Sequence, residues 1–336
     1  MNIMTRIGNR MTITLIAALL LIIFLLVALP ATEATGSLLP GTIVIAEQGL
    51  GQITIIPPGG GPVPLAAGLS SPRDVTVGPD GHVYAVEGTA AGRLLKIAPD
   101  GTVTPLLTNL NFPEGVSVDY DGKVVVTTFG GGQIIRVNPD GSGAQPLLNG
   151  ANQPSGIAAG TQAFPAGGYY FNEWATGILF YLPPDLSAPQ PVFQPMSNPD
   201  LMAISPDGFL YIADFSAGLI VEINPLTGQD RVVNNSLNNP VGVAVDTFSP
   251  GYDLLVSDNN QLLRLDRQSG VPANLGVFNN PAGIAVVPGH TIFHPDPDQE
   301  PKRNPDIGCE KEECEDEPSL AVVDPVYLDS NGFFYD

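Results

Sequence analysis

Short apolar runs alternate with turns rich in glycine and proline over most of the chain. Many of the turns contain an Asp-Gly pair, as at Asp80-Gly81 and Asp207-Gly208. Asp-Gly between apolar runs favours tight hairpins in which both turn residues have positive φ. The runs are too short and too closely punctuated for helices, so the pattern predicts an all-β fold of many strands.

A six-fold repeat organises these runs. The register is clearest on six prolines spaced by 41, 41, 45, 41 and 41 residues: Pro72, Pro113, Pro154, Pro199, Pro240 and Pro281. The residues after each proline are alike, as in Pro113-Glu-Gly-Val-Ser-Val and Pro240-Val-Gly-Val-Ala-Val. Each repeat holds four apolar runs, and a period near 41 with four strands is typical of a β-propeller.

The ends of the repeat region predict the number of blades. Three apolar runs precede the first proline of the series, at 42–46, 52–56 and 63–67, and one follows the last, at 283–287. Together they make one four-stranded blade closed by both chain ends. We therefore expect a single six-bladed propeller over residues 42–287, because an open solenoid of repeats would leave this division unexplained.

The residues before the repeats predict export. Arg6 and Arg10 precede an uncharged run whose apolar centre spans 13–29, and small residues follow it. This is the pattern of a signal peptide over residues 1–34, although the run is also long enough for an uncleaved membrane anchor. Both alternatives place the propeller outside the cytoplasm, either secreted, periplasmic or extracellular, or held at a membrane through this segment alone.

The last segment, residues 288–336, differs in composition. From residue 295 onward it holds 13 acidic and three basic residues, together with several prolines that favour an extended acidic tail. Cys309 and Cys314 are the only cysteines of the chain. Outside the cytoplasm their spacing predicts a local disulfide, and a pair without further cysteines is too little for a structural zinc site.

Charge limits the possible partners. The formal net charge of −21 argues against nucleic acid, because a phosphate backbone would be repelled. Hydrophobic residues make up 43% of the chain and charged residues only 14%, which argues against a largely disordered acidic polymer.

Propeller topology predicts two rings of side chains at one mouth of the central channel. The inner ring follows each proline by one residue and consists of Arg73, Glu114, Ser155, Asp200, Val241 and Ala282, with Asp74 beside it. The second ring ends the second strands and consists of Glu47, Glu87, Thr128, Glu173, Asp214 and Asp258. Converging carboxylates suit Ca²⁺ or a cationic ligand, although a short acid at a strand end can instead bind backbone donors in the next turn.

The repeat resembles the NHL type, and it is similar to the six-bladed propellers of the regucalcin (SMP-30)/gluconolactonase and strictosidine-synthase-like groups. The gluconolactonase resemblance implies a Ca²⁺-dependent lactonase with metal ligands at Glu114, Ser155 and Asp200, and with Asp200 as catalytic acid/base. Asparagine is expected at the first two of these positions, and a glutamate is expected where this chain has Ala282. The three histidines, His82, His290 and His294, lie off the inner strands, which argues against streptogramin-lyase-like or paraoxonase-like chemistry.

Four further positions are candidates for ligand binding at the mouth: Arg73, Asp74, Glu173 and Trp174. Trp174 either packs between blades or forms an aromatic wall that can stack on a sugar or another flat ligand. The four extra residues of its repeat are expected in a loop over 162–168. The sequence thus predicts an exported propeller that binds a small molecule, protein or glycan at an acidic channel mouth. The alternative is a Ca²⁺-dependent hydrolase of lactones or esters.

Overall fold

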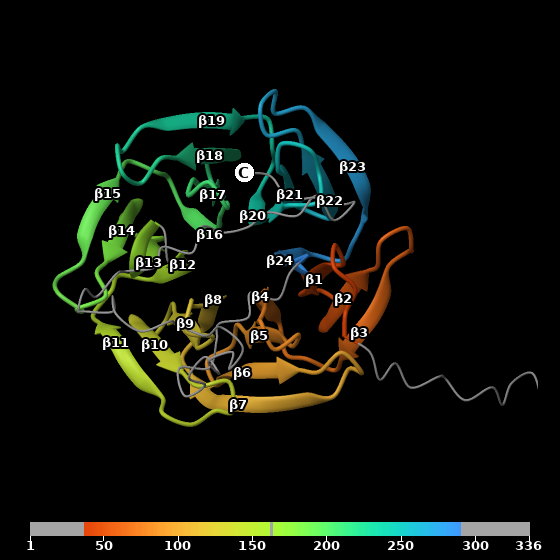
Figure 1. Cartoon of the computed structure of the whole chain (residues 1–336), viewed down its shortest axis with the longest axis horizontal. Helices are drawn as coiled ribbons and strands as arrows, with labels where there is room; N and C mark the ends of the chain where they lie inside the picture. Colours follow the sequence, from red (N-terminus) through yellow and green to blue (C-terminus); the bar gives the residue numbers. More distant parts are fainter. Residues whose placement is uncertain (1–36, 162–163, 290–336) are drawn as a thin grey trace, which may run out of the picture. The chain divides into compact units, whose positions relative to one another are not determined.

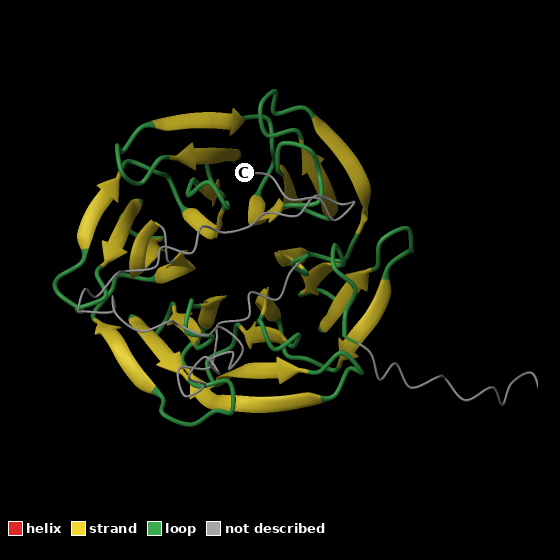
Figure 2. Ribbon diagram, viewed as in Figure 1, coloured by secondary structure: helices red, strands yellow, loops and turns green. Residues whose placement is uncertain are grey.

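The computed structural model describes residues 37–161 and 164–289. Within them it contains six four-stranded antiparallel sheets around a central axis and no helix (Figures 1 and 2). Written from the innermost strand outward, three blades are β24 (Pro281–Val286), β1 (Ile43–Glu47), β2 (Gln52–Ile56), β3 (Val63–Ala67); β4 (Pro72–Val77), β5 (Val83–Glu87), β6 (Gly92–Ile97), β7 (Val103–Leu110); and β8 (Pro113–Val118), β9 (Val124–Thr128), β10 (Gln133–Val137), β11 (Gln145–Asn149). The other three are β12 (Pro154–Thr161), β13 (Phe164–Glu173), β14 (Ile178–Leu182), β15 (Gln190–Phe193); β16 (Pro199–Ile204), β17 (Leu210–Asp214), β18 (Leu219–Ile223), β19 (Asp230–Asn234); and β20 (Pro240–Asp246), β21 (Asp253–Asp258), β22 (Gln261–Leu265), β23 (Pro272–Val277). The predicted six-bladed propeller is confirmed.

The six prolines of the repeat are the first residues of the six inner strands. Proline has no N–H to donate and is tolerated at the first position of a strand. Each inner strand then pairs with the second strand of its blade, so that Pro72 lies opposite Glu87 and Pro199 opposite Asp214. This register places the inner ring of side chains one residue inside each inner strand.

One blade combines strands from both ends of the described region. Strand β24 pairs with β1 in antiparallel register, with Ile43 opposite Val286 and Ile45 opposite Ile284. Their sheet contains β24 together with β1, β2 and β3, as the three-plus-one division of the runs predicts. The pairing gives both β24 and β1 a hydrogen-bonded neighbour and leaves no open edge between them.

The hydrophobic core lies between adjacent blades. The second strands are buried along their whole length in β1, β5, β9 and β17. Tyr84, Tyr170 and Tyr211 are among the largest fully enclosed side chains. The outer strands are half exposed, as in β7 and β23. A strand buried on both faces needs β-branched and aromatic residues on both, which explains why its apolar run is nearly continuous.

Two local expectations are wrong. The Asp-Gly turns do not have positive φ at both residues, because only the glycine adopts it, as at Gly81 (φ 76°). Gly81 N donates to Gly78 O with Pro79 between them, so the aspartate keeps negative φ and the glycine takes the left-handed position that follows the turn. The extra residues of the repeat that begins at Pro154 do not form a loop over 162–168. They lengthen a hairpin, since β12 reaches Thr161 and β13 begins at Phe164.

Several predictions concern segments outside the described residues. The signal or anchor segment, the acidic tail, the Cys309–Cys314 pair, His290 and His294 all belong to these segments. In the described part, no helix long and apolar enough to span a membrane is found.

Candidate functional site

One face of the ring carries the start of every inner strand and the end of every second strand, and we call it the proline face. Backbone hydrogen bonds join its two sets of loops, for example from Gly88 N to Ser71 O and from Trp174 N to Gln153 O. All predicted inner-ring and second-ring residues lie at this face, on the strand positions expected from the repeat. The structure therefore brings both rings together, as predicted.

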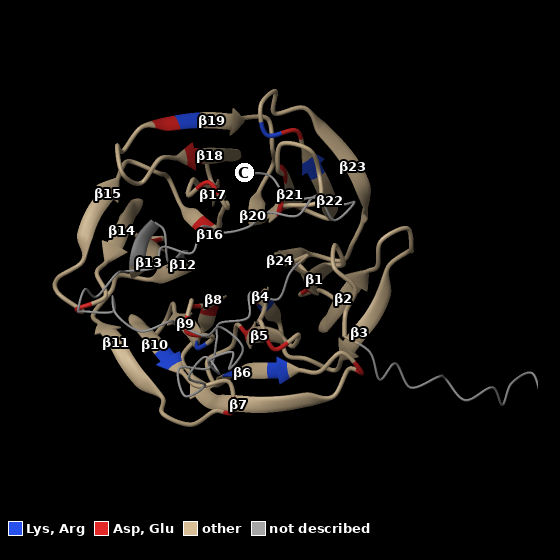
Figure 3. Ribbon diagram, in the orientation of Figure 1, with Lys and Arg blue, Asp and Glu red and all other residues tan. Residues whose placement is uncertain are grey.

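Arg73 extends across the central axis of the ring. It lies on β4, and its partners Glu114 and Asp200 lie on β8 and β16. Arg73 Nε donates to Glu114 Oε1 over 2.6 Å, and its Nη2 lies 3.2 and 3.1 Å from the two carboxylate oxygens of Asp200. Strands β4 and β16 belong to blades on opposite sides of the ring (Figure 1), and Figure 3 marks the acidic positions of β8 and β16 in red.

Gly88 makes room for this arginine. A Cβ atom at position 88 would lie 2.5 Å from Cγ of Arg73 and 3.5 Å from Pro113 O. The backbone of Gly88 does not require positive φ, so the constraint is steric. A side chain at this position would displace the aliphatic part of Arg73 and would move its guanidinium away from both carboxylates.

Burial and charge act in opposite directions on this ion-paired cluster. Burial raises the pKa of the Asp200 carboxyl, and the neighbouring Arg73 guanidinium opposes that rise. Burial would lower the pKa of Arg73, but Asp200 and Glu114 outweigh it and raise that pKa above its ordinary value. Both oxygens of Asp200 accept from one nitrogen of Arg73, which is the geometry of a charged pair.

Asp74, next to Arg73 on β4, links two inner strands. Its Oδ1 accepts from Val75 N over 2.8 Å, and its Oδ2 accepts from Val116 N on β8 over 2.9 Å. Burial raises the pKa of Asp74 to about 7, while the two backbone donors oppose the rise. Both oxygens of Asp74 already accept from backbone amides, which does not favour the predicted ligand-binding role. That role stays a prediction.

Ser155 and Asn172 form a second buried connection, between blades. Ser155 Oγ donates to Pro199 O over 2.7 Å, and Asn172 Nδ2 lies within 2.8 Å of Ser155 Oγ, Pro199 O and Asp200 O. Both side chains are fully enclosed. Thr127 and Ser257 occupy the position equivalent to Asn172 in their own blades, and each donates to the inner strand of the next blade. Sequence reasoning missed Asn172, although the polar residue before each second-ring position was visible in three repeats.

The second-ring acids bind backbone amides. Each of the five acids accepts an N–H from the residue two positions before the proline of its own blade, at 2.7 to 2.9 Å. The donors to Glu47, Glu87, Glu173, Asp214 and Asp258 are Asn279, Ser70, Asn152, Ser197 and Asn238. These carboxylates are buried and serve to hold the loop that leads into each inner strand. They do not form an open ring of charge.

The predicted calcium ligands do not fit a calcium site in this arrangement. The Arg73 guanidinium occupies the space between the carboxylates of Glu114 and Asp200, and Ser155 Oγ is committed to a carbonyl. Calcium needs six to eight oxygen ligands, and a guanidinium among them opposes any cation. Within the described residues no group of three or more His, Cys, Asp or Glu is arranged to hold a metal ion. Calcium binding stays a prediction that these geometries do not favour.

Trp174 belongs to a row of aromatic side chains, which we call the aromatic arc: Phe112, Phe129, Trp174 and Phe215. The Phe129 and Trp174 ring centroids are 6.4 Å apart with planes at 70°, and those of Trp174 and Phe215 are 5.5 Å apart. Phe129, Trp174 and Phe215 each follow a second-ring residue on consecutive blades, where the other blades have Gln48, Gly88 and Asn259. These three rings are half buried. Each ring therefore packs between blades with one part and is exposed at the proline face with the other.

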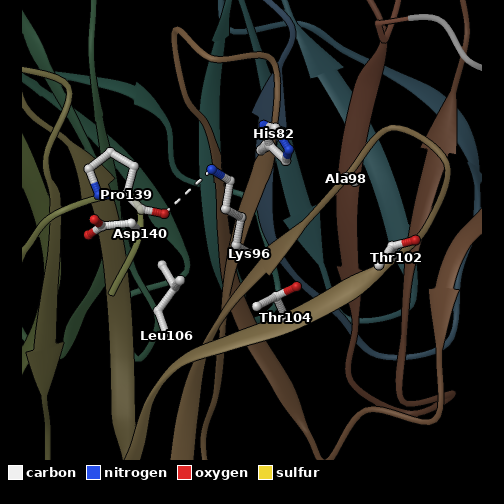
Figure 4. A pocket seen from close by; sticks show the side chains of 8 residues that line it. All are labelled: His82, Lys96, Ala98, Thr102, Thr104, Leu106, Pro139 and Asp140. Atoms are coloured by element: carbon white, nitrogen blue, oxygen red, sulfur yellow. Dashed lines mark hydrogen bonds between the residues drawn. The ribbon is translucent and has the colours of Figure 1, made fainter. Parts of the chain in front are cut away.

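His82 lies on the opposite face, as predicted, in the loop between β4 and β5. It borders a pocket of about 230 Å³, together with Lys96, Thr104 and Asp140 (Figure 4). Lys96 Nζ lies 2.8 Å from Asp80 and 3.4 Å from Pro139 O, and Asp80 also accepts from Tyr84. The lysine and the aspartate thus neutralise each other, while the carboxylate of Asp140 accepts hydrogen bonds from Ser142.

A larger pocket of about 380 Å³ lies between the blade of β1 and β2 and the blade of β20 to β23. It is lined by Pro58, Ile56, Phe248, Arg264 and others. Arg264 pairs with Asp246 at 2.7 Å. Neither pocket touches the inner ring, so neither changes the assignment of the candidate site to the proline face.

Comparison with known proteins supports the fold and nothing more specific. No protein-family model matches the chain, and no curated protein matches its sequence. Among solved structures, a nidogen/laminin complex aligns with a TM-score of 0.64 and 18% identity, covering 74% of this chain and 99% of that one. Virginiamycin B lyase from Staphylococcus aureus aligns with a TM-score of 0.56 and 18% identity, covering 76% and 94%. A protein of unknown function from Bacteroides caccae aligns with a TM-score of 0.57 and 17% identity, covering 74% and 99%.

These similarities agree with the six blades of the structure and place the chain in the class of six-bladed β-propellers, as the repeat predicts. At such low identity the likeness carries the fold only, because one propeller fold serves many unrelated functions.

Proposed function

We propose that the protein is an exported propeller that binds its ligand at the proline face without transforming it. The observation that carries this proposal is the position of Arg73. Its guanidinium lies between Glu114 and Asp200 and contacts both, and these are the two carboxylates that a lactonase would need for metal binding and for acid/base work. Arg73 Nη2 contacts both oxygens of Asp200, so a substrate would have to displace the guanidinium to reach this carboxylate.

Two further observations support a binding role. The second-ring acids are buried and accept hydrogen bonds from backbone amides and from neighbouring side chains such as Arg93 and Thr176, so they are engaged within the protein. No histidine lies on the six inner strands of the described ring. A propeller of similar fold takes part in the nidogen/laminin complex, which is in keeping with a binding role.

Calorimetric titration of Ca²⁺ tests this proposal against the hydrolase alternative. The full chain is purified in mild detergent, stripped with a chelator and titrated, and a panel of lactones and aryl esters is assayed with and without Ca²⁺. We expect no stoichiometric calcium uptake and no turnover above that of heat-inactivated protein. A single tight calcium site, lost together with turnover in Asp200→Asn, would overturn the proposal in favour of the hydrolase.

A further inference from the structure

Charged residues are absent from every loop of the proline face. Six loops lead into the inner strands, and six follow the second strands, all of them within the described residues. The first set spans 68–71, 111–112, 150–153, 194–198, 235–239 and 278–280, and the second spans 48–51, 88–91, 129–132, 174–177, 215–218 and 259–260. None contains Asp, Glu, Lys, Arg or His. Because the chain carries a net charge of −21, the absence of charged residues from all these loops needs an explanation.

The opposite face has the contrary composition. Its described loops carry Asp80, Asp100, Asp119, Asp121, Lys123, Asp140, Asp185, Asp207, Asp266 and Arg267. The charged residues of the loops are therefore confined to one side of the ring. Loops at both faces belong to the same blades, yet only those at the opposite face carry charged residues.

Amide side chains take the place of charge on the proline face. Ten of them are exposed in these loops: Asn111, Asn152, Gln153, Gln194, Asn235, Asn238, Asn259, Asn260, Asn279 and Asn280. An amide both donates and accepts hydrogen bonds, and it does so without net charge. This chemistry matches a ligand that presents donors and acceptors side by side, as the hydroxyl groups of a sugar do.

The aromatic arc supplies the apolar half of the same surface. Phe129, Trp174 and Phe215 cover three consecutive blades, and Phe112 beside them is 44% exposed. The apolar C–H face of a sugar ring packs on aromatic rings, while its edges seek hydrogen bonds. The arc and the amides therefore offer the two kinds of contact that a sugar requires.

We propose that the proline face binds a neutral carbohydrate chain through the aromatic arc and the surrounding amides. This inference deepens the proposed function and rests on it. An anionic polymer would be repelled by the net charge of the protein, and a cationic one would find no free carboxylate in these loops. A neutral polyhydroxyl ligand meets neither penalty.

A protein partner fits this face less well. A stable protein interface buries about 800 Å² on each side around a continuous apolar core. Among the large apolar side chains that are strongly exposed in the described region, only Leu50 and Phe112 belong to these loops. Two separate side chains among amides do not make such a core, whereas a chain of sugars needs only single aromatic platforms.

Trp174 permits a direct test, because it is the only tryptophan of the protein. The full chain in mild detergent is titrated with neutral hexasaccharides of glucose (α- and β-linked), mannose, galactose and N-acetylglucosamine. Tryptophan emission is recorded, and hits are checked by calorimetry. We expect at least one hexasaccharide to give a saturable change, with at least a tenfold loss of affinity in Phe215→Ala. The matched control Phe248→Ala, an exposed aromatic outside these loops, leaves affinity unchanged.

The outcomes separate the inference from the function on which it rests. No saturable response to any neutral hexasaccharide by either method overturns the inference. If a captured and identified protein then binds, and Phe215→Ala weakens it, the proline face remains the binding site and only the carbohydrate assignment fails. Sugar binding that is indifferent to Phe215→Ala and to Trp174→Phe, with both variants folded by circular dichroism, overturns both proposals.

Discussion

Arg73 and Asp200 lie on opposite blades of the six-bladed ring, and one guanidinium nitrogen of Arg73 meets both carboxylate oxygens of Asp200. The two residues are 127 positions apart in the chain. Asp200 is almost fully enclosed, and Arg73 keeps 18% of its side-chain surface exposed. The pair thus ties together two blades that share no strand pairing.

Arg73→Met is expected to destabilise the fold by about 3 kcal/mol, because it leaves buried carboxylates without their cation. The double variant Arg73→Met/Asp200→Asn is expected to lose less than the sum of its two single variants. Urea unfolding at pH 7.5 measures all three free energies of unfolding. Additive losses would show that the two residues do not interact, contrary to the geometry.

Gly88→Ala should weaken the contact between Arg73 and Asp200 by displacing the arginine side chain. Its Cβ would meet Arg73 Cγ at 2.5 Å, so either the arginine moves or the second strand shifts. Overpacking of this kind typically costs 1–3 kcal/mol, and we expect about 2 kcal/mol in urea unfolding. In an Arg73→Met background the same substitution should cost clearly less, because methionine is flexible and no longer tied to the carboxylates.

Gly61→Ala is the matched control for this prediction. A Cβ at Gly61 meets nothing within 4 Å, and its backbone does not require positive φ. Its free energy of unfolding should stay within about 0.5 kcal/mol of the wild type. An equal loss in Gly61→Ala and Gly88→Ala would remove the steric explanation.

Asn172 should be replaceable by the side chain that the equivalent position has in another blade. Asn172→Ala removes the amide donor to Asp200 O and leaves Pro199 O with Ser155 Oγ alone, and we expect a loss of about 2 kcal/mol. Asn172→Ser should lose less than half as much, since Ser257 donates to Ala282 O from the same position.

Thermal and urea unfolding of both Asn172 variants, with Asn149→Ala as an exposed control, measure these differences. Asn149→Ala should change stability by no more than about 0.5 kcal/mol. Equal losses in the serine and alanine variants would mean that the bridge between the blades contributes little.

The repeat determined the ring, but it did not determine what happens inside it. The six prolines identified the first residue of each inner strand, and the residue at the end of each second strand, acidic in five of the six blades, was placed correctly. The sequence could not show that Arg73 reaches across to Asp200. That contact depends on the missing side chain at Gly88 and on the ring's closed geometry.

The role of the second-ring acids was open for a similar reason. A carboxylate at a strand end can face a ligand or the preceding loop, and the two alternatives have the same sequence. The structure assigns Glu87, Asp214 and their equivalents to backbone donors. Phe129 and Phe215 were visible in the sequence at the same repeat position as Trp174, and comparing that position across repeats would have revealed the aromatic arc.

Asp74 should make the stability of the protein depend on pH in an unusual direction. Its pKa is about 7 in the folded chain, against an ordinary value of 3.8. Between these values the folded state therefore binds more protons at this site than the unfolded state does. The contribution of Asp74 to the free energy of unfolding is largest below pH 4. It falls as the pH rises toward about 7, by at most about 1.4 kcal/mol per pH unit, and is constant above that value.

Other carboxyls act in the opposite direction, because the pKa of Glu87 and that of Glu222 are held below their ordinary values and those groups lose their contribution as the pH falls. The difference between wild type and Asp74→Asn isolates the effect of Asp74. We expect Asp74→Asn to be the less stable of the two at pH 4.5, because its amide has only one oxygen for two backbone donors. The gap should narrow steadily up to pH 7.5, as the buried carboxyl of the wild type is forced to ionise. Urea unfolding at half-unit steps of pH measures it. A gap that is constant with pH would mean that Asp74 keeps an ordinary pKa despite its burial.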